Sequence, residues 1–175
     1  MPTRPLKFLL AGGGTGGHLF PALAIADALK ARLPDSRFLF AGRRDKIEGR
    51  VVPERGYPFA PIWISGFHRN FRPGNLMFPL RVGVSLLQAF FLIRRFKPDV
   101  AIGTGSYVAA PVVFMASLLG IPTILHESNS EPGFTTRLLA RKATRVFTGF
   151  AETADRLGNR GNIETVGTPT RSSLG

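Results

Sequence analysis

The sequence predicts an α/β fold in which a Rossmann-like parallel sheet is flanked by helices. Short apolar runs alternate with helix-length segments along the 175 residues, as in strands joined by crossover helices. Most of the runs are continuously apolar rather than alternating with polar residues, which is typical of parallel strands buried on both faces. Glycine-rich turns stand between two of the runs and the helical segments that follow them.

The individual elements follow from these runs in chain order. We expect strands at residues 6–11, 37–41, 59–64, 99–103, 122–126, 145–148 and 163–166. Helices are expected at residues 21–32, 76–96, 108–119 and 134–142. Pro21 suits the first turn of a helix, where its missing N–H costs nothing, and Pro34 ends that helix before the second strand. Residues 66–75 are rich in turn residues and are expected to form an exposed loop.

Composition limits the class of protein. The chain is 44% hydrophobic and 19% charged, which is ordinary for a soluble globular protein, and its length suits one domain with its own core. It contains no cysteine, which excludes disulfides and thiolate metal sites. We expect neither a signal peptide nor a transmembrane helix, because no apolar stretch reaches about 18 residues.

The charge is strongly basic. The chain has 23 Lys and Arg against 11 Asp and Glu, which gives a net charge of +12. Such a field favours an anionic partner: a nucleic acid, a phosphorylated substrate or an acidic membrane surface. The alternative is that the charge only keeps the protein soluble. A nucleic-acid-binding domain rests on charge alone, because the chain has no recognised binding motif and no aromatic stacking platform.

A glycine-rich loop follows the first expected strand. Residues 12–18 read GGGTGGH and formally match G-x-G-x-x-G, a pattern that lets backbone N–H groups approach a diphosphate at a helix N-terminus. The second strand leads into Arg43 and Arg44 rather than a carboxylate, so a dinucleotide would have to be NADP. Alternatively, the glycines leave room for a sugar substrate and His18 accepts its proton. His18 could also lie near the start of a helix without any chemical role.

Two further polar clusters are expected at the same edge of the sheet. Residues 103–107, Gly-Thr-Gly-Ser-Tyr, follow the fourth strand, and residues 126–129, His-Glu-Ser-Asn, follow the fifth. The loops at the carboxyl ends of parallel strands lie along one edge, where ligands bind in open α/β sheets. An NADP module does not account for the second and third clusters, so together the three favour a sugar-transfer site.

In order and spacing these residues resemble the MurG family, whose fold is two Rossmann-like domains facing a cleft, the GT-B arrangement. The resemblance covers essentially the whole chain and is carried by residues 12–18, 21–24, 48, 52–53, 64–66, 97–100, 120–122, 126–129 and 166–171. The chain departs from the family at Ser106, Ser128 and Thr168, where Gly, Gln and Asn are usual. The resemblance implies that residues 1–166 form an acceptor-binding domain, that residues 167–175 begin an interdomain linker, and that the C-terminal donor-binding domain is absent.

The family implies an inverting transfer of N-acetylglucosamine from UDP-N-acetylglucosamine to undecaprenyl-linked lipid I, giving lipid II for peptidoglycan synthesis. No cofactor and no protein-held metal are implied, and the isolated half is expected to be inactive. By carry-over, His18 is the catalytic base, and the donor is bound by Thr15, Gly16, Gly17, Asn129 and Arg171. The acceptor is bound by Gly105, Ser106, Tyr107, His126 and Glu127.

A lipid acceptor requires contact with a membrane, and one segment suits it. We expect the start of the helix at residues 76–96 to touch the anionic inner leaflet while the rest of that helix packs on the sheet. The apolar contacts would be Phe71, Leu76, Met77, Phe78 and Leu80, flanked by Arg69, Arg72 and Arg81. The protein would then be peripheral on the cytoplasmic face of the bacterial cell membrane, with no nucleic-acid partner.

Overall fold

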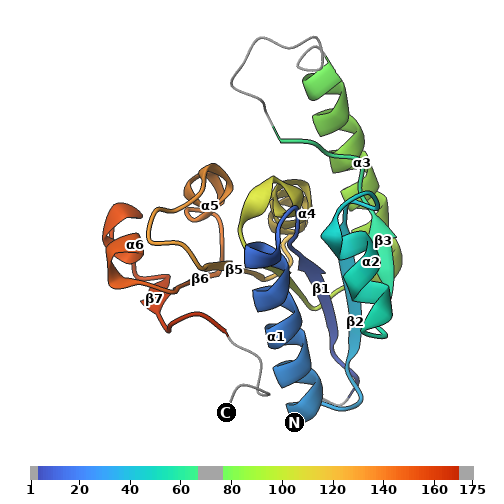
Figure 1. Ribbon diagram of the computed structural model, residues 1–175, viewed down its shortest axis with the longest axis horizontal. Helices are drawn as coiled ribbons and strands as arrows, with labels where there is room; N and C mark the ends of the chain where they lie inside the picture. Colours follow the sequence, from blue (N-terminus) through green and yellow to red (C-terminus); the bar gives the residue numbers. More distant parts are fainter. Residues whose placement is uncertain (1–3, 67–76, 170–175) are drawn as a thin grey trace.

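The computed structural model describes residues 4–66 and 77–169, which form a seven-stranded parallel sheet with helices on both faces (Figure 1). The strands are β1 (Lys7–Ala11), β2 (Arg37–Gly42), β3 (Phe59–Pro61), β4 (Val100–Gly103), β5 (Thr123–Glu127), β6 (Arg145–Thr148) and β7 (Ile163–Thr165). The helices are α1 (Gly16–Arg32), α2 (Ile47–Glu54), α3 (Phe78–Phe96), α4 (Ser106–Leu118), α5 (Phe134–Leu139) and α6 (Ala151–Arg156). The predicted α/β fold with a parallel sheet is confirmed.

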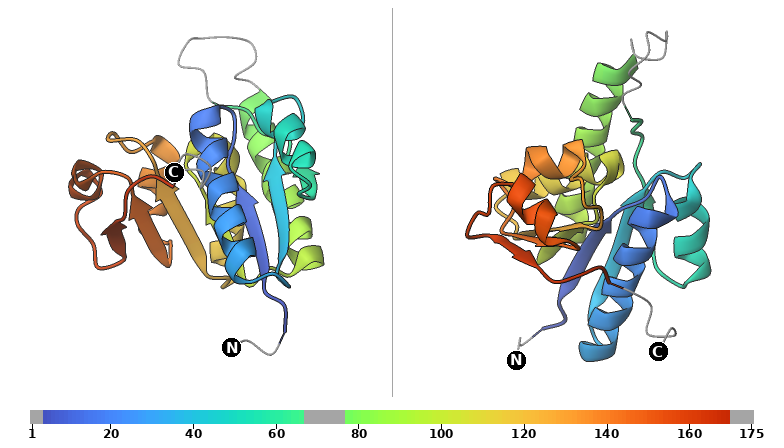
Figure 2. Two further views of the ribbon diagram at one scale, coloured as in Figure 1. Left: turned by 60° about the horizontal axis from the view of Figure 1, so that its bottom comes forward. Right: turned by 60° about the vertical axis from the view of Figure 1, so that its left-hand side comes forward.

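The sheet separates two apolar cores. Successive residues of a strand point to opposite faces, so Phe8 and Leu10 of β1 pack with α1 and α2, whereas Leu9 and Ala11 pack with α3, α4 and α5. Figure 2 shows α1 and α2 on one face of the sheet and α3, α4 and α5 on the other. Burial on both faces explains why the strands are continuously apolar in sequence.

The strand order is β3-β2-β1-β4-β5-β6-β7, and every neighbouring pair is parallel. From β1 the chain runs outward through β2 and β3, and from β4 it runs outward in the opposite direction. The loops after β1 and β4 therefore leave the sheet toward opposite faces. This divergence creates a crevice at the carboxyl edge, where ligands of open α/β sheets bind.

Several element boundaries were predicted wrongly. The first helix begins at Gly16, not at residue 21, because the last glycines of the loop already form its first turn and Pro21 lies inside the helix. β3 ends at Pro61 rather than at residue 64, and α5 ends at Leu139 rather than at residue 142. Helices α2 and α6 were not predicted, since both are short and neither carries a sustained apolar period. Within the described ranges, no helix is long and apolar enough to cross a bilayer.

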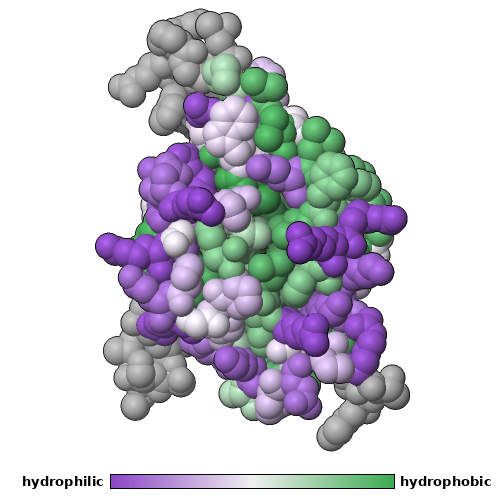
Figure 3. All heavy atoms as spheres, turned by 90° about the vertical axis from the view of Figure 1, so that its right-hand side faces the viewer, coloured by the Kyte–Doolittle hydropathy of each residue, from purple (hydrophilic) through white to green (hydrophobic). Residues whose placement is uncertain are grey.

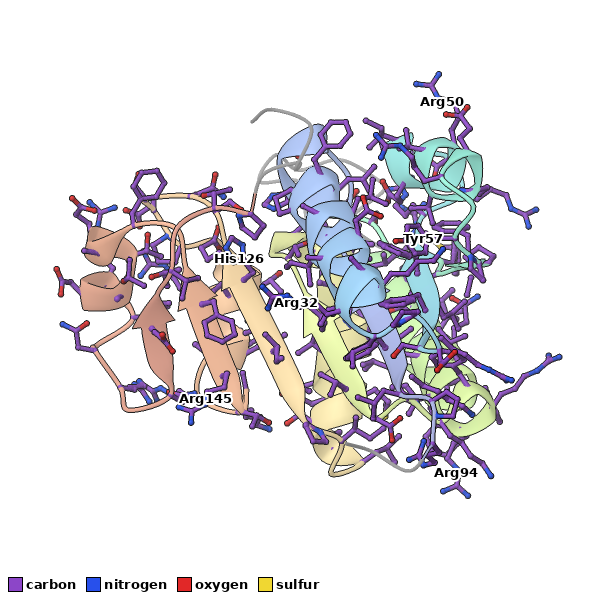
Figure 4. All side chains as sticks on the ribbon, turned by 90° about the horizontal axis from the view of Figure 1, so that it is seen from below. Arg32, Arg50, Tyr57, Arg94, His126 and Arg145 are labelled. Carbon is purple, nitrogen blue, oxygen red and sulfur yellow. The ribbon has the colours of Figure 1, made fainter. Side chains whose placement is uncertain are left out.

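Basic side chains gather at the amino edge of the sheet, opposite the crevice. Arg4, Lys7, Arg37 and Lys97 line a hollow of about 400 Å³ there, and Figure 4, seen from this side, shows Arg32, Arg94 and Arg145. The helices end at this edge, and their C-termini carry partial negative charge that basic residues stabilise. Part of the high net charge thus has a structural explanation.

Candidate active site

The site begins with two loops that meet at the crevice, one after β1 and one after β4. Thr15 precedes α1 and Gly105 precedes α4, and neither helix has a side chain capping its N-terminus. Neither helix has an acidic residue in its first turn. The unpaired N–H groups of a helix N-terminus attract anions. Two such helix ends therefore face the same crevice.

His18 is held by Thr104 across the crevice. The Nδ1 atom of His18 lies 2.9 Å from the carbonyl oxygen of Thr104, and the Thr104 hydroxyl donates to the carbonyl oxygen of His18 over 2.6 Å. A carbonyl oxygen only accepts, so Nδ1 carries the proton of the neutral imidazole. The lone pair is then on Nε2, which is left to accept a proton from a ligand. His18 thus has the tautomer that a general base requires.

Two glycines at the crevice are required for the packing of the protein around His18 and Thr104. A Cβ on Gly12 would lie 1.9 Å from the Thr104 hydroxyl, and a Cβ on Gly105 would lie 3.0 Å from Nδ1 of His18. Gly105 also has a φ of +73°, which side chains other than glycine rarely adopt. These two glycines therefore permit the close approach that fixes His18.

Glu48 supports the first loop and was not among the predicted site residues. Its buried carboxylate accepts hydrogen bonds from the backbone N–H of Gly14, at 2.9 Å, and of Arg43, at 3.1 Å. A Cβ on Gly13 would lie 2.3 Å from the carboxyl carbon. The sequence identified Glu48 only as one of the residues that carry the resemblance to the MurG family. Its role could not be predicted, because its partners come from two separate loops. Thr104 was likewise missed, since it looked like one residue of a glycine-rich turn.

Tyr107 lies over the first loop from the start of α4. Its hydroxyl accepts a hydrogen bond of 3.4 Å from Arg43, and a Cβ on Gly14 or Gly66 would contact its ring at 3.5 or 3.3 Å. Asp45 forms an ion pair with Arg43 and raises the pKa of that guanidinium, mainly through the hydrogen bond. The charge of Arg43 is therefore already matched within the protein, which weakens the NADP alternative.

Ser106 begins α4 in a strained conformation. Its φ is +64°, in the left-handed region that favours glycine, which is the residue that the resemblance noted above implies at this position. Its hydroxyl oxygen is buried and has no hydrogen-bond partner within the described part of the chain. Ser106 is therefore strained by the turn, and no hydrogen bond of its hydroxyl to the described residues offsets that strain.

We expect Ser106→Gly to stabilise the chain by about 1 kcal/mol. The change removes a left-handed strain of about 1–2 kcal/mol and an unsatisfied hydroxyl, against about 0.5–1 kcal/mol of extra glycine entropy in the unfolded chain. Urea unfolding at equilibrium measures the difference. Ser117→Gly, near the end of the same helix, is the control and should cost about 0.5 kcal/mol. A loss of stability in Ser106→Gly would contradict the strain argument.

Glu127 organises the loop that follows β5. It is fully buried, with 0% of its surface exposed, and its two oxygens accept four hydrogen bonds. The donors are the backbone N–H and side-chain amide of Asn129, at 3.2 and 2.8 Å, the N–H of Gly133, at 3.0 Å, and the Thr136 hydroxyl, at 2.6 Å. Asn129 is exposed at the crevice edge, so Glu127 fixes the side chain that is predicted to meet the donor.

His126 points to the opposite face of the sheet from Glu127, as neighbouring residues of a strand do. Figure 4 shows it at the end of β5, where it is only 2% exposed. Its Nε2 donates to the carbonyl oxygen of Gly167 over 3.0 Å, and the Ser128 hydroxyl lies 3.2 Å from Nδ1. Both ring nitrogens are thus engaged within the protein, and the imidazole ties β5 to the segment after β7.

Acid is expected to destabilise the chain through His126. Burial lowers the pKa of this imidazole, although the Gly167 hydrogen bond and the Glu127 charge oppose the shift. The unfolded chain then binds more protons than the folded chain below the ordinary histidine pKa of about 6.5. The stability from His126 is present above that pH and is lost as the pH falls toward the lower folded value, by at most about 1.4 kcal/mol per pH unit.

Urea unfolding between about pH 7.5 and pH 5 measures this slope, with His126→Gln as the comparison. Glutamine keeps an N–H donor for Gly167 but does not titrate. The variant should therefore lose stability less steeply over this range. Equal slopes for the two proteins would show that His126 does not carry the acid sensitivity.

The remaining predicted site residues are distributed as follows. Thr15 and Gly17 are exposed at the start of α1, with Gly16 half-buried beside them. Met77, just before α3, and Leu80 within it are exposed, Phe78 is half-buried, and Arg81 lies over the ring of Trp63. Five predicted residues lie outside the described ranges: Phe71, Leu76, Arg69, Arg72 and Arg171. Among the described residues, no group of three or more His, Asp or Glu side chains could hold a metal ion.

The class of protein follows from comparison with known families. Residues 8–148 match the family described as the glycosyltransferase family 28 N-terminal domain, and the chain belongs to that family. Similar curated proteins are the UDP-N-acetylglucosamine–N-acetylmuramyl-(pentapeptide) pyrophosphoryl-undecaprenol N-acetylglucosamine transferases of Salinibacter ruber and Flavobacterium psychrophilum. They are 46% and 42% identical over 99% and 96% of this chain. Within the family the chain is therefore of the MurG type, as its sequence predicts.

A solved structure agrees with this assignment. The crystal structure of Acinetobacter baumannii MurG is similar with a TM-score of 0.78 at 28% identity, over 96% of this chain and 46% of that one. The chain spans about half the length of the curated relatives, 47% and 46% of the two proteins named above. The sheet thus has the arrangement of a GT-B N-terminal domain.

Proposed function

We propose that this chain is the acceptor-binding half of an inverting glycosyltransferase that moves N-acetylglucosamine from UDP-N-acetylglucosamine to lipid I. The observation that carries the proposal is the tautomer of His18, which leaves Nε2 free to take the proton of an attacking hydroxyl. A direct displacement needs such a base on the acceptor side of the reacting carbon. Because the chain spans about half of its relatives, we expect it to bind the acceptor but not to turn over alone.

The diphosphate groups of the substrates suit the two uncapped helix ends. The N-termini of α1 and α4 offer backbone N–H groups, and neither first turn contains an acidic residue. The buried carboxylates near them, those of Glu48 and Glu127, already accept hydrogen bonds from the loops. The names of the relatives include a pyrophosphoryl-undecaprenol acceptor. The exposed Thr15 and Gly17, with Asn129 across the crevice, are then the groups we assign to the donor.

Because its acceptor is linked to a lipid, we propose that the protein works at a membrane surface. Figure 1 shows α3 extending beyond the other helices at the carboxyl edge, and Figure 3 shows apolar side chains gathered over this face of the molecule. Met77 and Leu80 are exposed there, and Arg81 is close by. Apolar side chains beside a cation suit the surface of an anionic leaflet. The proposed location is peripheral, on the cytoplasmic face.

Co-sedimentation with anionic vesicles over a salt series tests the proposal. We expect vesicles that contain lipid I to bind the chain more tightly than vesicles without it, with a difference that persists as salt rises. Tyr107→Ala should reduce this difference, and Gly83→Ala, whose new methyl group meets only open space, should not. Binding that follows lipid charge alone and disappears with salt would refute the acceptor role.

A further inference from the structure

We infer that a groove between α3, α4 and α5 binds the first isoprene units of the acceptor's lipid chain. This inference rests on the proposed function and adds a subsite to it. The groove has a volume of about 400 Å³, within the range of small-molecule sites. Its apolar side chains come from all three helices and from the segment after β3, and they include Ile64, Val82, Leu86, Pro111, Phe114 and Leu138.

The groove starts at the candidate active site. Tyr107 lines it, and the same side chain meets Arg43 and lies against the glycine loop at Gly14. Figure 2 shows α3, α4 and α5 side by side on one face of the sheet. A diphosphate at the N-terminus of α4 would therefore have its first prenyl carbons beside Tyr107, at the mouth of the groove.

The chemistry of the groove matches a hydrocarbon that makes no hydrogen bonds. The hydroxyl of Ser85, one of its few polar groups, already donates to the carbonyl oxygen of Val82. At the rim, Phe134 is 81% exposed and Leu138 is 56% exposed. Large apolar groups that line a concave surface and remain in water mark a binding site. The first isoprene units of a chain attached to a pyrophosphate, as named in the relatives, suit the groove and its position.

A second exposed apolar surface provides the comparison. Leu87 and Phe91 on α3 are 60% and 66% exposed, which is similar to the groove rim, but they do not line the groove. A ligand that binds any exposed apolar surface should be weakened equally by changes at the groove rim and by changes at Leu87 and Phe91. A chain bound in the groove should depend on the rim residues Phe134 and Leu138 and not on Leu87 and Phe91.

The experiment is calorimetric titration of this chain with inorganic diphosphate and with geranyl, farnesyl and geranylgeranyl diphosphates, each below its micelle concentration. We expect the affinity to rise at least about tenfold for each added isoprene unit until the groove is full, because each buried CH₂ contributes about fourfold. The double variant Phe134→Ser/Leu138→Ser should show a clearly weaker dependence on chain length, because it removes the exposed apolar rim of the groove. Leu87→Ser/Phe91→Ser should keep the length dependence of the unaltered chain.

The outcomes separate the groove from the proposed function. Equal binding of inorganic diphosphate and every prenyl diphosphate would overturn the groove and leave the diphosphate site intact. Failure of all four ligands to bind would overturn both. Equal weakening by the two double variants would show a general apolar surface rather than a groove. If sedimentation showed a dimer that only Phe134→Ser/Leu138→Ser dissociates, the groove would be an interface between copies and the inference would be wrong.

Discussion

Replacing His18 by alanine is expected to lower kcat for sugar transfer by about 10²–10⁴-fold in a protein that carries both halves of the transferase. The Nε2 atom of His18 would take the acceptor proton as the new bond forms, so its removal raises the barrier of that step. KM should change little, because this interaction develops in the transition state rather than in the bound ground state. Steady-state kinetics with UDP-N-acetylglucosamine and lipid I measures both constants.

A Thr104 variant distinguishes the role of His18 as a base from the role of Thr104 in positioning it. In Thr104→Val the carbonyl that accepts from Nδ1 remains, and only the 2.6 Å hydroxyl bond to the His18 carbonyl is lost. We expect kcat to fall by roughly fivefold, the effect of losing a bond worth about 1 kcal/mol. Nitrogen NMR of the isolated chain should show neutral His18 protonated on Nδ1 and His126 on Nε2. Near-normal kcat in His18→Ala would exclude His18 as the base.

Glu127→Gln is expected to lower the free energy of unfolding by about 3 kcal/mol. Both oxygens of the buried carboxylate accept hydrogen bonds, from Asn129, Gly133 and Thr136. The amide nitrogen of glutamine would face N–H or O–H donors, so at least one pair of donors would lose its acceptor. For a chain of this size the melting temperature should fall by about 6–12 °C. Thermal and urea unfolding both measure the loss.

Glu131→Gln is the matched control in the same loop. Glu131 forms ion pairs with Arg137 and Arg156, but its side chain is mostly exposed. Exposed pairs contribute about 0–1 kcal/mol, so the change should hardly affect stability. If the two variants lost the same stability, the hydrogen bonds to Glu127 would not be what holds this loop.

The strands were predictable because their signal is local. Burial on both faces makes each of them a short apolar run, and the crossover rule then orders them in a parallel sheet. Helix α2 was missed because it is short and has a mostly polar surface, so it offers little apolar periodicity. The first residues of α1 were missed because glycines are poor helix formers, and here tertiary contacts override that preference.

The candidate site was predictable as a set of loops but not as a set of contacts. His18 and Thr104 are 86 positions apart in sequence, and Glu48 reaches Gly14 over 34 positions. No local pattern encodes such pairs. His126 and Glu127 were read together as acceptor-binding residues, yet the strand sends them to opposite faces and buries both. Their predicted role at the acceptor stays a prediction, and the geometry adds an anchoring role to each.

The two uncapped helix ends at the crevice also determine how a bound diphosphate would respond to its surroundings. Backbone N–H groups do not titrate at physiological pH, so the protein's side of this attraction does not change with pH. A lysine or arginine side chain can swing away and form an ion pair with a carboxylate elsewhere. A backbone N–H is fixed in the helix and cannot. A phosphate site built from helix ends therefore has donors whose positions are fixed before the ligand arrives, which a site built from flexible cationic side chains does not.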